Sequence, residues 1–398
     1  MKKILQVILL CLCAVTLASL VYLRLGQKDI LGSDGSGPAA PSPSVSLSPS
    51  PTLSPSPTPK PTAAPSPSPS PEQFTLSFVG DCTLTSHQNL WIESPYHYNM
   101  RMNGDYSYPF SNTIQYFKDD ELTFANLECT FSDQQIYSGQ TFHFKAPTDW
   151  AQILTNGSVE FVTTANNHMY DFGEAGAQDT FATLEKWGIA YGKDGQAQIL
   201  ETKSGLKLGI YCAYESYLPS KDKAAAAITQ LLEQGAEYII CMFHWGQELY
   251  YEPNSNQIDL AHACIDAGAD LVYGSHTHCL QPLEEYNGGL IMYSMGNWSF
   301  GGNTSPKDRD TAILQVTVQR DLDGTVSPLG YEAIPCCISS LPVGADEGAD
   351  NDYRPMPYDK NSEEYARTMA KLDGSYDFKS QGTDYSGWYS SYGGSPTE

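Results

Sequence analysis

Two apolar segments that each run into histidine residues dominate the middle of the sequence. The first ends at His244, and the second leads through a glycine to His276 and His278. Between them, residues 254–268 place apolar side chains at helical spacing behind an Asn-Ser start signal. The pattern predicts a strand, a helix and a second strand parallel to the first. Because parallel strands of one sheet end at the same edge, we expect the three histidines to converge there.

Other strand-like segments also end in polar side chains. In chain order these ends carry Asp81, Glu128, and the neighbouring pair Asn167 and His168. The further predicted elements are a strand opening at 74, strands at 122–127, 159–164 and 291–293, helices at 174–187, 224–234 and 362–372, and hairpins at 199–211 and 312–334. Strands and helices in this alternation predict an α/β fold.

The polar strand ends together indicate a metal centre. Taken singly, a buried histidine is usually a hydrogen-bonded structural residue, and an aspartate after glycine is usually a turn residue. As a set, however, carboxylates, an Asn-His pair, a single histidine and a His-x-His suit a borderline metal such as Zn, Mn or Fe. The predicted metal ligands are Asp81, Glu128, Asn167, His244, His276 and His278.

Metal-assisted hydrolysis is the chemistry that such ligands support. One or two divalent ions would lower the pKa of a bound water and polarise a phosphoryl or carbonyl oxygen. His168, which lies beside the asparagine but outside the ligand set, is predicted to protonate a leaving group. Glu248 is predicted to orient a histidine from behind the ligands, and Asp171 and Asn297 are expected in the same supporting layer.

The composition limits the classes of partner and indicates the state of the cysteines. The formal net charge is -24, whereas a nucleic-acid-binding protein needs a basic footprint, so nucleic acid is excluded as a partner. The ten cysteines show no zinc-knuckle spacing. Most lie in or beside apolar segments, which favours buried thiols over disulfides.

The first 72 residues precede the predicted fold. Residues 1–26 contain two lysines and an apolar run long enough for a bilayer, which predicts a signal anchor, a transmembrane helix with its N-terminus in the cytoplasm. A cleaved signal peptide is the alternative. Residues 27–72 are rich in Pro and Ser and predict a disordered, extended stalk. The protein is therefore expected at the cell membrane, single-pass, with its domain on the extracytoplasmic side.

Two further boundaries follow from the apolar periodicity. Residues 73–341 carry it and form the predicted domain, within which 93–112, rich in Tyr, Asn and Pro, is predicted to be a surface loop. Residues 342–398 are predicted to be a C-terminal extension, largely irregular apart from the helix at 362–372.

Six short motifs occur in a fixed order along the domain. They are Gly80-Asp81, Asn126-Leu127-Glu128, Ala165-Asn166-Asn167-His168, His244-Trp245-Gly246, Gly274-Ser275-His276-Thr277-His278 and Tyr293-Ser294-Met295-Gly296-Asn297. As an ordered set they resemble the CapA family, the bacterial capsule synthesis proteins linked to poly-γ-glutamate. The resemblance covers roughly residues 74–335. It implies a membrane-anchored surface protein that supports synthesis or export of an anionic capsule polymer.

The CapA family in turn resembles the calcineurin-like metallophosphoesterases. That resemblance implies a sandwich of two mixed β-sheets flanked by helices, with the six predicted ligands around the metal and His168 as the acid. Two positions depart from the pattern. Thr83 stands where the first motif has a histidine, and Glu128 replaces a bridging aspartate. Because threonine is a poor substitute for an imidazole, one metal position is expected to be weak or absent.

Three functions remain open from the sequence. The first is the capsule role, with the membrane, an anionic polymer and capsule synthesis proteins as partners. The second is an active metal-dependent phosphoesterase that acts on a cell-surface substrate. The third is a polymer-binding scaffold whose metal site is vestigial. The retained His168 favours activity, whereas Thr83 argues against a complete two-metal site.

Overall fold

The folded part of the chain follows the Pro/Ser-rich segment. The computed structural model describes residues 70–86, 96–135, 139, 142–215, 220–345 and 350–378. The chain divides into the units Met1–Ser66 and Pro67–Glu398, and the described residues all belong to the second. The predicted signal anchor and nearly all of the stalk lie outside the described residues. Among the residues that are described, no helix has the length and apolar character needed to cross a bilayer.

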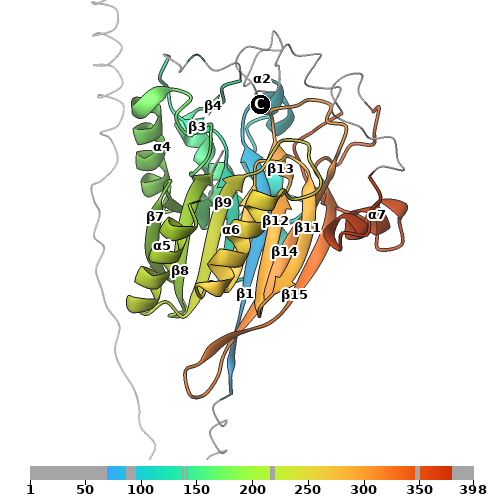
Figure 1. Cartoon of the computed structure of the whole chain (residues 1–398). Coiled ribbons are helices and arrows are strands. Elements are labelled where there is room, and N and C mark those ends of the chain that lie inside the picture. Colours follow the sequence, from blue (N-terminus) through green and yellow to red (C-terminus); the bar gives the residue numbers. More distant parts are fainter. Residues whose placement is uncertain are drawn as a thin grey trace, which may run out of the picture. The chain divides into compact units, whose positions relative to one another are not determined.

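An eight-stranded mixed sheet forms one half of the folded unit (Figure 1). Its strands are β1 (Glu72–Thr83), β2 (Leu122–Leu127), β5 (Phe161–Thr163), β6 (Ala190–Gly192), β13 (Asn297–Phe300), β14 (Asp310–Arg320), β15 (Val326–Cys337) and β16 (Met356–Pro357). The order is β16-β15-β14-β1-β2-β5-β6, and β13 pairs with β1. β1 runs parallel to β2 and antiparallel to β14, so the long first strand joins the two halves of the sheet.

A six-stranded mixed sheet forms the other half. Its strands are β7 (Gln196–Glu201), β8 (Lys207–Glu215), β9 (Tyr238–Trp245), β10 (Leu271–Ser275), β11 (Leu280–Tyr286) and β12 (Gly289–Met295), in the order β11-β12-β10-β9-β8-β7. The predicted strand–helix–strand unit is confirmed, because β9 and β10 are parallel. The helix between them begins at the predicted signal, where Asn254 and Gln257 cap the first turn reciprocally.

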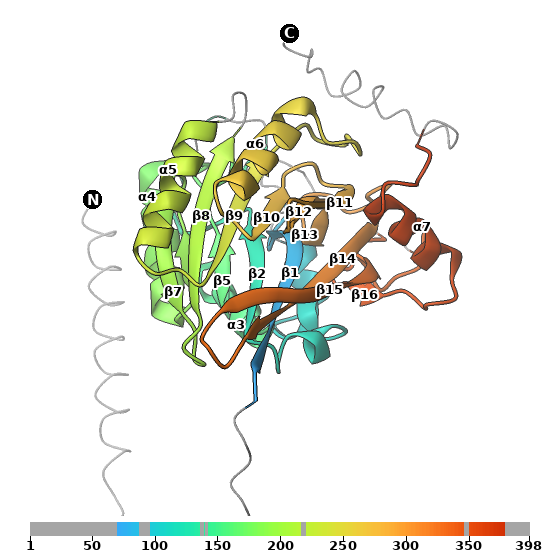
Figure 2. The same ribbon diagram turned by 60° about the horizontal axis from the view of Figure 1, so that its bottom comes forward.

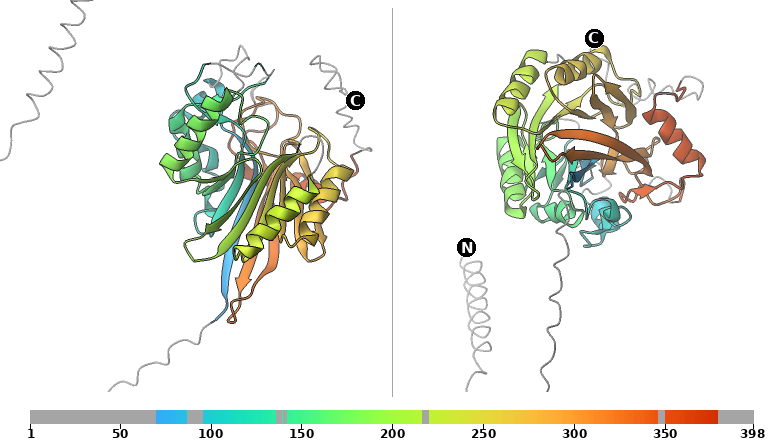
Figure 3. Two further views of the ribbon diagram at one scale, coloured as in Figure 1. Left: turned by 60° about the vertical axis from the view of Figure 1, so that its left-hand side comes forward. Right: turned by 90° about the horizontal axis from the view of Figure 1, so that it is seen from below.

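Helices cover the outer faces of the sheets. They are α2 (Tyr96–Met102), α3 (Gln152–Asn156), α4 (Gly173–Trp187), α5 (Lys221–Glu233), α6 (Ser255–Asp266) and α7 (Glu363–Leu372). α5 and α6 lie side by side over the six-stranded sheet, and α4 lies on the side of the other sheet (Figures 2 and 3). A small pair of strands, β3 (Thr130–Phe131) and β4 (Lys145–Ala146), packs beside α4.

The two sheets pack against each other through a core without exposed side chains. Phe78 of β1 stacks on Phe124 of β2 with ring centroids 4.8 Å apart, and Tyr273 of β10 lies 6.2 Å from Phe78 across the interface. The Tyr273 hydroxyl donates to the carbonyl of Val79 at 2.8 Å, so its one polar atom is satisfied inside the core. The predicted α/β sandwich of two mixed sheets flanked by helices is therefore confirmed.

The interpretation of residues 93–112 as a surface loop was wrong for the part that is described. That part contains α2 and a 3-10 turn at Tyr108–Phe110. Tyr98, Met102 and Phe110 are buried, and the ring of Phe110 lies 6.4 Å from that of Trp298. The burial of these three side chains could not be predicted, because a short helix and a single turn among polar residues are too short to show apolar periodicity.

The described part of the C-terminal extension is more ordered than the sequence indicates. The predicted helix at 362–372 is confirmed as α7, and β16 adds a further strand to the edge of the eight-stranded sheet. Lys371 Nζ lies 2.9 Å from Asp310 and 2.8 Å from Asp308, and Arg367 donates to Asp310 at 2.6 and 2.7 Å. These charged contacts join α7 to β14 across a long sequence separation, which apolar periodicity cannot reveal.

One half-buried acid makes stability depend on pH. Burial raises the pKa of Asp120 to about 7, although Thr123 donates a hydrogen bond to it at 2.8 Å. When the pKa of an acid is higher in the folded than in the unfolded state, the protein loses stability as pH rises from the unfolded pKa towards the folded pKa. We therefore expect Asp120→Asn to raise the free energy of unfolding at pH 8 by on the order of 1 kcal/mol, after allowance for partial exposure, and to change nothing below pH ~4.

Urea unfolding of both proteins between pH 4 and 8 measures this difference. Asp119→Asn is the matched control, because the neighbouring Asp119 side chain is 84% exposed and should give the same free energy as the wild type at every pH. If Asp120→Asn raised the free energy of unfolding equally at pH 4 and at pH 8, the raised pKa could not belong to Asp120.

Candidate metal centre

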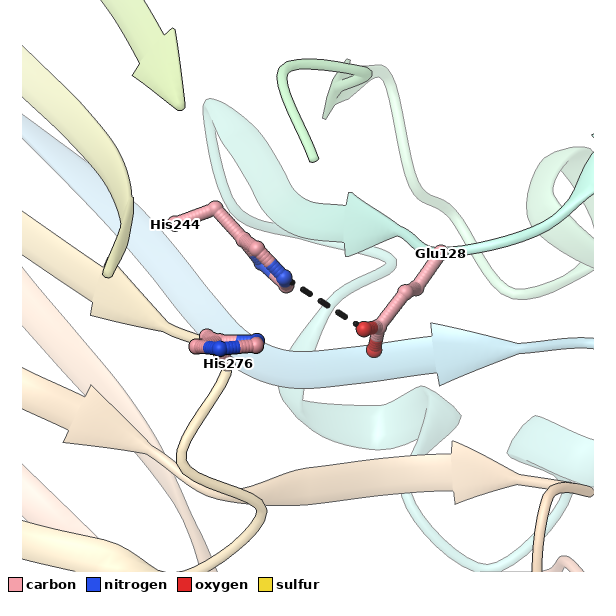
Figure 4. Close-up of side chains that lie close together, drawn as sticks. All are labelled: Glu128, His244 and His276. Atoms are coloured by element: carbon pink, nitrogen blue, oxygen red, sulfur yellow. Dashed lines mark ion pairs between the residues drawn. The ribbon is translucent and has the colours of Figure 1, made fainter. Parts of the chain in front are cut away.

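The polar strand ends meet at one edge of the two sheets. Asp81 lies in β1 and Glu128 follows β2, in the eight-stranded sheet. His244 lies in β9, and His276 and His278 occupy the turn after β10, in the six-stranded sheet. Figure 4 shows Glu128, His244 and His276 pointing toward one another. The structure thus brings together residues that are up to 197 positions apart (81 to 278), as the parallel strand ends predicted.

Two glycines permit this close approach of the strands. A Cβ on Gly80 would lie 2.0 Å from the carbonyl oxygen of Gly296, and one on Gly274 would lie 2.0 Å from that of Tyr293. Because the obstructing atoms belong to the backbone, only glycine fits at either position. Asp81 follows directly, and its amide donates to that same Gly296 oxygen at 2.9 Å. The position of the Asp81 carboxylate therefore depends on residue 80 having no Cβ.

The histidine turn has a strained backbone. His276 and His278 have φ values of 93° and 56°, a region that residues with a Cβ rarely enter. The residue between them is held on both sides: the Thr277 hydroxyl is 2.8 Å from that of Ser294, and its carbonyl accepts from the amide of Leu249 at 2.7 Å. Strain that is fixed in this way is concentrated at functional sites.

The hydrogen bonds of His244 define which of its nitrogens faces the site. Its Nδ1 lies 2.9 Å from the Ser275 hydroxyl and 3.3 Å from the side-chain amide nitrogen of Asn126. Both contacts hold Nδ1 on the side away from Glu128. Nε2 lies 2.7 Å from Asn167 Oδ1 and 3.4 Å from Glu128 Oε1. An imidazole nitrogen, an amide oxygen and a carboxylate oxygen therefore lie together, and these are atoms that bind a divalent cation.

Two further groups lack the partners that their burial demands. Neither carboxylate oxygen of Glu128 has a hydrogen-bond partner among the described residues, and the same is true of His276 Nδ1. Glu128 is completely buried. A buried polar atom without a partner is costly, and a buried carboxylate is more so. The donor set therefore fits a divalent ion, which would compensate both residues.

His278 approaches the acidic side of the same cluster. Its Nδ1 lies 3.0 Å from Asn297 Oδ1 and 3.3 Å from Asp81 Oδ2. The Asn297 amide nitrogen donates to the His278 carbonyl at 3.2 Å, which fixes the orientation of that amide. Nδ1 therefore faces two acceptors and carries the proton, and Nε2 is the nitrogen that remains for a metal. Asn297 therefore contacts His278 from behind, and its supporting role stays a prediction.

The pKa shifts show how strongly the cluster attracts positive charge. Burial lowers the pKa of His244 well below its usual value and that of His276 to about 4, so both are neutral and offer lone pairs at pH 7. Burial alone would also lower the pKa of His278, but the Glu128 carboxylate, with Asp81, raises it to about 10. Burial, reinforced by Asp81, raises the pKa of Glu128 itself. The cluster is therefore short of positive charge.

The side chains form two overlapping groups of possible ligands. Glu128, His244 and His276 offer ligand atoms within 4.8 Å of one another, and Asp81, Glu128 and His278 do the same. Glu128 belongs to both. A carboxylate shared between two ligand groups is the arrangement expected of a bridging residue in a two-ion site. The metal roles of these residues remain predictions.

His168 lies beside the cluster and is held by a carboxylate. Its Nδ1 is 2.8 Å from Asp171 Oδ2, and the same oxygen accepts from the amide of Phe144 at 2.8 Å. The Phe144 ring packs edge-on against the imidazole at 4.7 Å. These contacts fix the ring and assign the Nδ1 proton, so Nε2 is the nitrogen left to exchange a proton. Asp171 therefore supports His168 rather than a metal ligand.

Two asparagines and a serine connect the ligands and were not predicted. The amide of Asn126 donates to Asp81 at 2.8 Å, and Asn166 donates to Asn126 at 3.0 Å. Ser275 fixes His244, as described above. Asn126 could have been found, because it is an amide inside the buried apolar strand Leu122–Leu127. Ser275 and Asn166 gave no comparable signal, since both lie in motifs in which the neighbouring histidine dominates.

The last two positions singled out in the sequence lie at the margins of the cluster. The Glu248 carboxylate contributes to the raised pKa of His278, which places it within electrostatic range, but the predicted hydrogen bond to a histidine stays a prediction. Thr83 is buried, and its hydroxyl donates to the backbone carbonyl of Glu128 at 3.3 Å. The threonine therefore supports the backbone at Glu128 where an imidazole was expected.

The chain matches known sequences over the region that carries this cluster. The family "Bacterial capsule synthesis protein PGA_cap" matches residues 75–211 and 191–301, which together span 227 of the 398 residues (75 to 301). "PGA biosynthesis protein CapA" of Bacillus subtilis (strain 168) is 28% identical over 244 residues, or 55% of this chain and 64% of that protein. The match thus spans less than two thirds of that relative.

Two other proteins extend the comparison. "Capsule biosynthesis protein CapA" of Bacillus anthracis is 27% identical over 296 residues, or 65% of this chain and 70% of that protein. Among solved structures, the NAD nucleotidase NadN of Haemophilus influenzae is 14% identical and aligns over 76% of this chain and 63% of its own, with a TM-score of 0.38. A TM-score of 0.38 is too low to support an argument about the fold, which follows instead from the two sheets described above.

Proposed function

The chain belongs to the bacterial capsule synthesis protein family PGA_cap, and from this membership we propose that it supports the synthesis or export of an anionic capsule polymer. Poly-γ-glutamate is the proposed polymer. The names of the two Bacillus relatives, both CapA proteins of PGA or capsule biosynthesis, support this choice. Other proteins of capsule synthesis are the proposed partners.

We further propose that a divalent ion, Mn, Zn or Fe, works at the cluster around Glu128. The observation that carries this proposal is the convergence of His244 Nε2, Asn167 Oδ1 and Glu128 Oε1, with neither oxygen of the buried Glu128 carboxylate hydrogen-bonded among the described residues. Asp81, His276 and His278 complete the proposed ligands. Thr83, in the position where the resembled pattern has a histidine, makes one of two ion positions weaker than the other. When bound, such an ion lowers the pKa of a water and polarises a phosphoryl or carbonyl oxygen.

The chain's own residues supply the proton transfer. The Asp171 carboxylate holds Nδ1 of His168, so the imidazole keeps one orientation and presents Nε2 to a leaving group. Burial of the surrounding strands excludes water from the rest of the cluster. The reaction class that these parts support is hydrolysis of a phosphoester or a related bond at the cell surface.

We also propose that residues 1–26 anchor the chain in the cytoplasmic membrane and that 27–72 hold the domain away from it on the outer side. The two N-terminal lysines, the apolar run and the Pro/Ser-rich composition support this placement. Fractionation of cells and protease treatment of intact cells would test it. A chain recovered in the cytoplasm would overturn it.

Deletion of the gene in its own host tests the capsule role. The measured quantity is surface polymer, as glutamate released by acid hydrolysis of the polymer extracted from the surface of washed cells. We expect the deletion to lose the polymer, and the wild-type chain to restore it, while His276→Ala does not. His262→Ala is the matched control, because His262 lies in α6, 3.0 Å from Glu284, outside the cluster. An unchanged amount of polymer in the deletion strain would overturn the proposal.

The same variants separate the two alternatives. If deletion leaves the polymer intact but the purified chain turns over an aryl phosphate, and His276→Ala does not, the protein is a phosphoesterase with another surface substrate. If His276→Ala restores the polymer fully, the chain acts as a scaffold with a vestigial metal site. Elemental analysis of the purified chain, with about one or two ions expected, accompanies both assays.

The proton-transfer role gives a separate prediction. We expect Asp171→Asn to lower the turnover of an aryl phosphate by about 10²-fold or more with unchanged metal content, because the amide no longer holds His168 in the required tautomer. Steady-state rates and elemental analysis of the same samples provide the measurement. Asp179→Asn is the control, since the Asp179 carboxylate, on α4, accepts from the Ser132 hydroxyl at 2.6 Å and does not contact His168. Equal rates for Asp171→Asn and the wild type would exclude His168 as the acid.

A further inference from the structure

A cavity of about 720 Å³ lies between α7 and the sheet edge, apart from the metal centre. One wall is apolar and includes Leu341, Val343 and Met356, of which Val343 is 81% and Met356 40% exposed. A volume of this size accommodates a drug-sized molecule or two to three aromatic side chains. Apolar side chains around a cavity of this size mark a candidate binding site.

The opposite wall is aromatic. Tyr251 and Phe378 stack with ring centroids 4.2 Å apart, and Tyr376 meets Phe378 edge-on at 4.7 Å. The ammonium of Lys371 lies 5.2 Å from the Tyr251 ring and 5.7 Å from the Tyr376 ring. Stacked rings beside a cation favour a further aromatic group.

The charges of α7 disfavour an anionic occupant. The basic side chains that line the cavity are those of Lys307, Arg309, Arg367 and Lys371. Of these, Arg367 is bonded to Asp310, Lys371 to Asp308 and Asp310, and Arg309 lies 3.8 Å from Asp350. A polyanion would have to compete with these carboxylates for the same donors. Glu364 adds another negative charge to the lining. The cavity therefore suits a neutral, aromatic segment and not a capsule polyanion.

The chain itself provides such a segment. Phe378 is the last described residue, and it lines the cavity. The 20 residues that follow, 379–398, lie outside the described residues and include Tyr385, Trp388, Tyr389 and Tyr392. Trp388 is ten positions beyond Phe378, and an extended stretch of that length reaches on the order of 33 Å, which is ample to turn back into the cavity.

We infer that the C-terminal segment around Trp388 and Tyr389 docks in this cavity and covers its apolar wall. The tether raises the effective concentration of the segment, so docking needs few contacts. Tyr251 lies in the same loop as Glu248, between β9 and α6, and the preceding carbonyl, of Tyr250, accepts from Gln281 at 2.9 Å. The docked segment would thus also support a loop beside the metal centre. The inference does not depend on the proposed function.

Fluorine NMR of the full chain containing 5-fluorotryptophan tests the docking. Trp388→Phe identifies the Trp388 signal among the six tryptophans. We expect that signal to be shielded from a soluble paramagnetic agent in the wild type and to become several-fold more sensitive in Met356→Glu. Leu329→Glu is the control, because Leu329 is 55% exposed on β15 and does not line the cavity. Full sensitivity of Trp388 in the wild type would overturn the inference.

Hydrogen exchange provides a second readout. In the full-length variant Trp388→Ser with Tyr389→Ser, the amides of residues 341, 343 and 251 should exchange several-fold faster than in the wild type. Unchanged exchange would overturn the inference. So would native mass spectrometry that finds a small molecule retained equally by the wild type and the variant, because the occupant would then be exogenous. Shielding of Trp388 that disappears on dilution would place the segment in a second copy and overturn docking within one chain.

Discussion

Glu128→Gln should have opposite effects on the stability of the metal-free and the metal-loaded protein. In the metal-free protein the variant is expected to be more stable by about 1 to 3 kcal/mol, because it replaces a buried carboxylate that has no hydrogen-bond partner among the described residues. In the presence of a divalent ion the wild type should gain about 3 to 4 kcal/mol at 100 to 1,000 times the dissociation constant. The variant should lose nearly all of that gain.

Thermal and urea unfolding with and without Mn or Zn, together with elemental analysis, measure both effects. Glu160→Gln is the matched control: burial also raises the pKa of Glu160, but its carboxylate accepts from Thr123 and Ser158 and does not belong to the cluster. The control should respond to metal like the wild type. If Glu128→Gln binds the ion as tightly as the wild type, Glu128 is not a ligand, and the proposal of a bridging carboxylate fails.

Gly80→Ala is expected to be among the most damaging single substitutions in the chain. The new Cβ would lie 2.0 Å from the carbonyl oxygen of Gly296 and 2.9 Å from that of Met295. Both obstacles are backbone atoms, so relief requires β1 to move away from the segment that precedes β13. We expect a loss of more than about 4 kcal/mol, the range in which single mutations become exceptional, and a low yield of soluble protein.

The damage should extend to the metal centre. The Gly296 oxygen that the Cβ would strike also accepts from the amide of Asp81, so any folded fraction should bind metal more weakly. Ser77→Ala, three residues earlier in the same strand, is the control. It removes the hydrogen bonds of the Ser77 hydroxyl with Gln315 and Asp120 and should cost only about 1 to 2 kcal/mol with metal binding intact. A loss for Gly80→Ala as small as that of the control would show that the strands can separate freely.

The sequence by itself determined the parallel unit and the edge at which its histidines lie. Apolar runs of strand length, an Asn254 start signal and helical spacing between them are local properties, and parallel connection places strand ends at one edge. The same reasoning located α4, α5 and α7 to within a few residues. Glu128 and Asp81 were found as candidates because each closes an apolar run, a pattern that needs no knowledge of the partner strand.

Only the tertiary structure decided how those residues act on one another. The orientation of the His244 ring follows from Ser275, 31 positions away, and the lack of a hydrogen-bond partner for the Glu128 carboxylate follows from which donors fail to reach it. Neither fact has a local signature, since both depend on distances between separate strands. The contacts between α7 and Asp310 were hidden for the same reason. Periodicity reports which face of an element is buried, whereas the neighbour that it meets is fixed only when the two sheets pack.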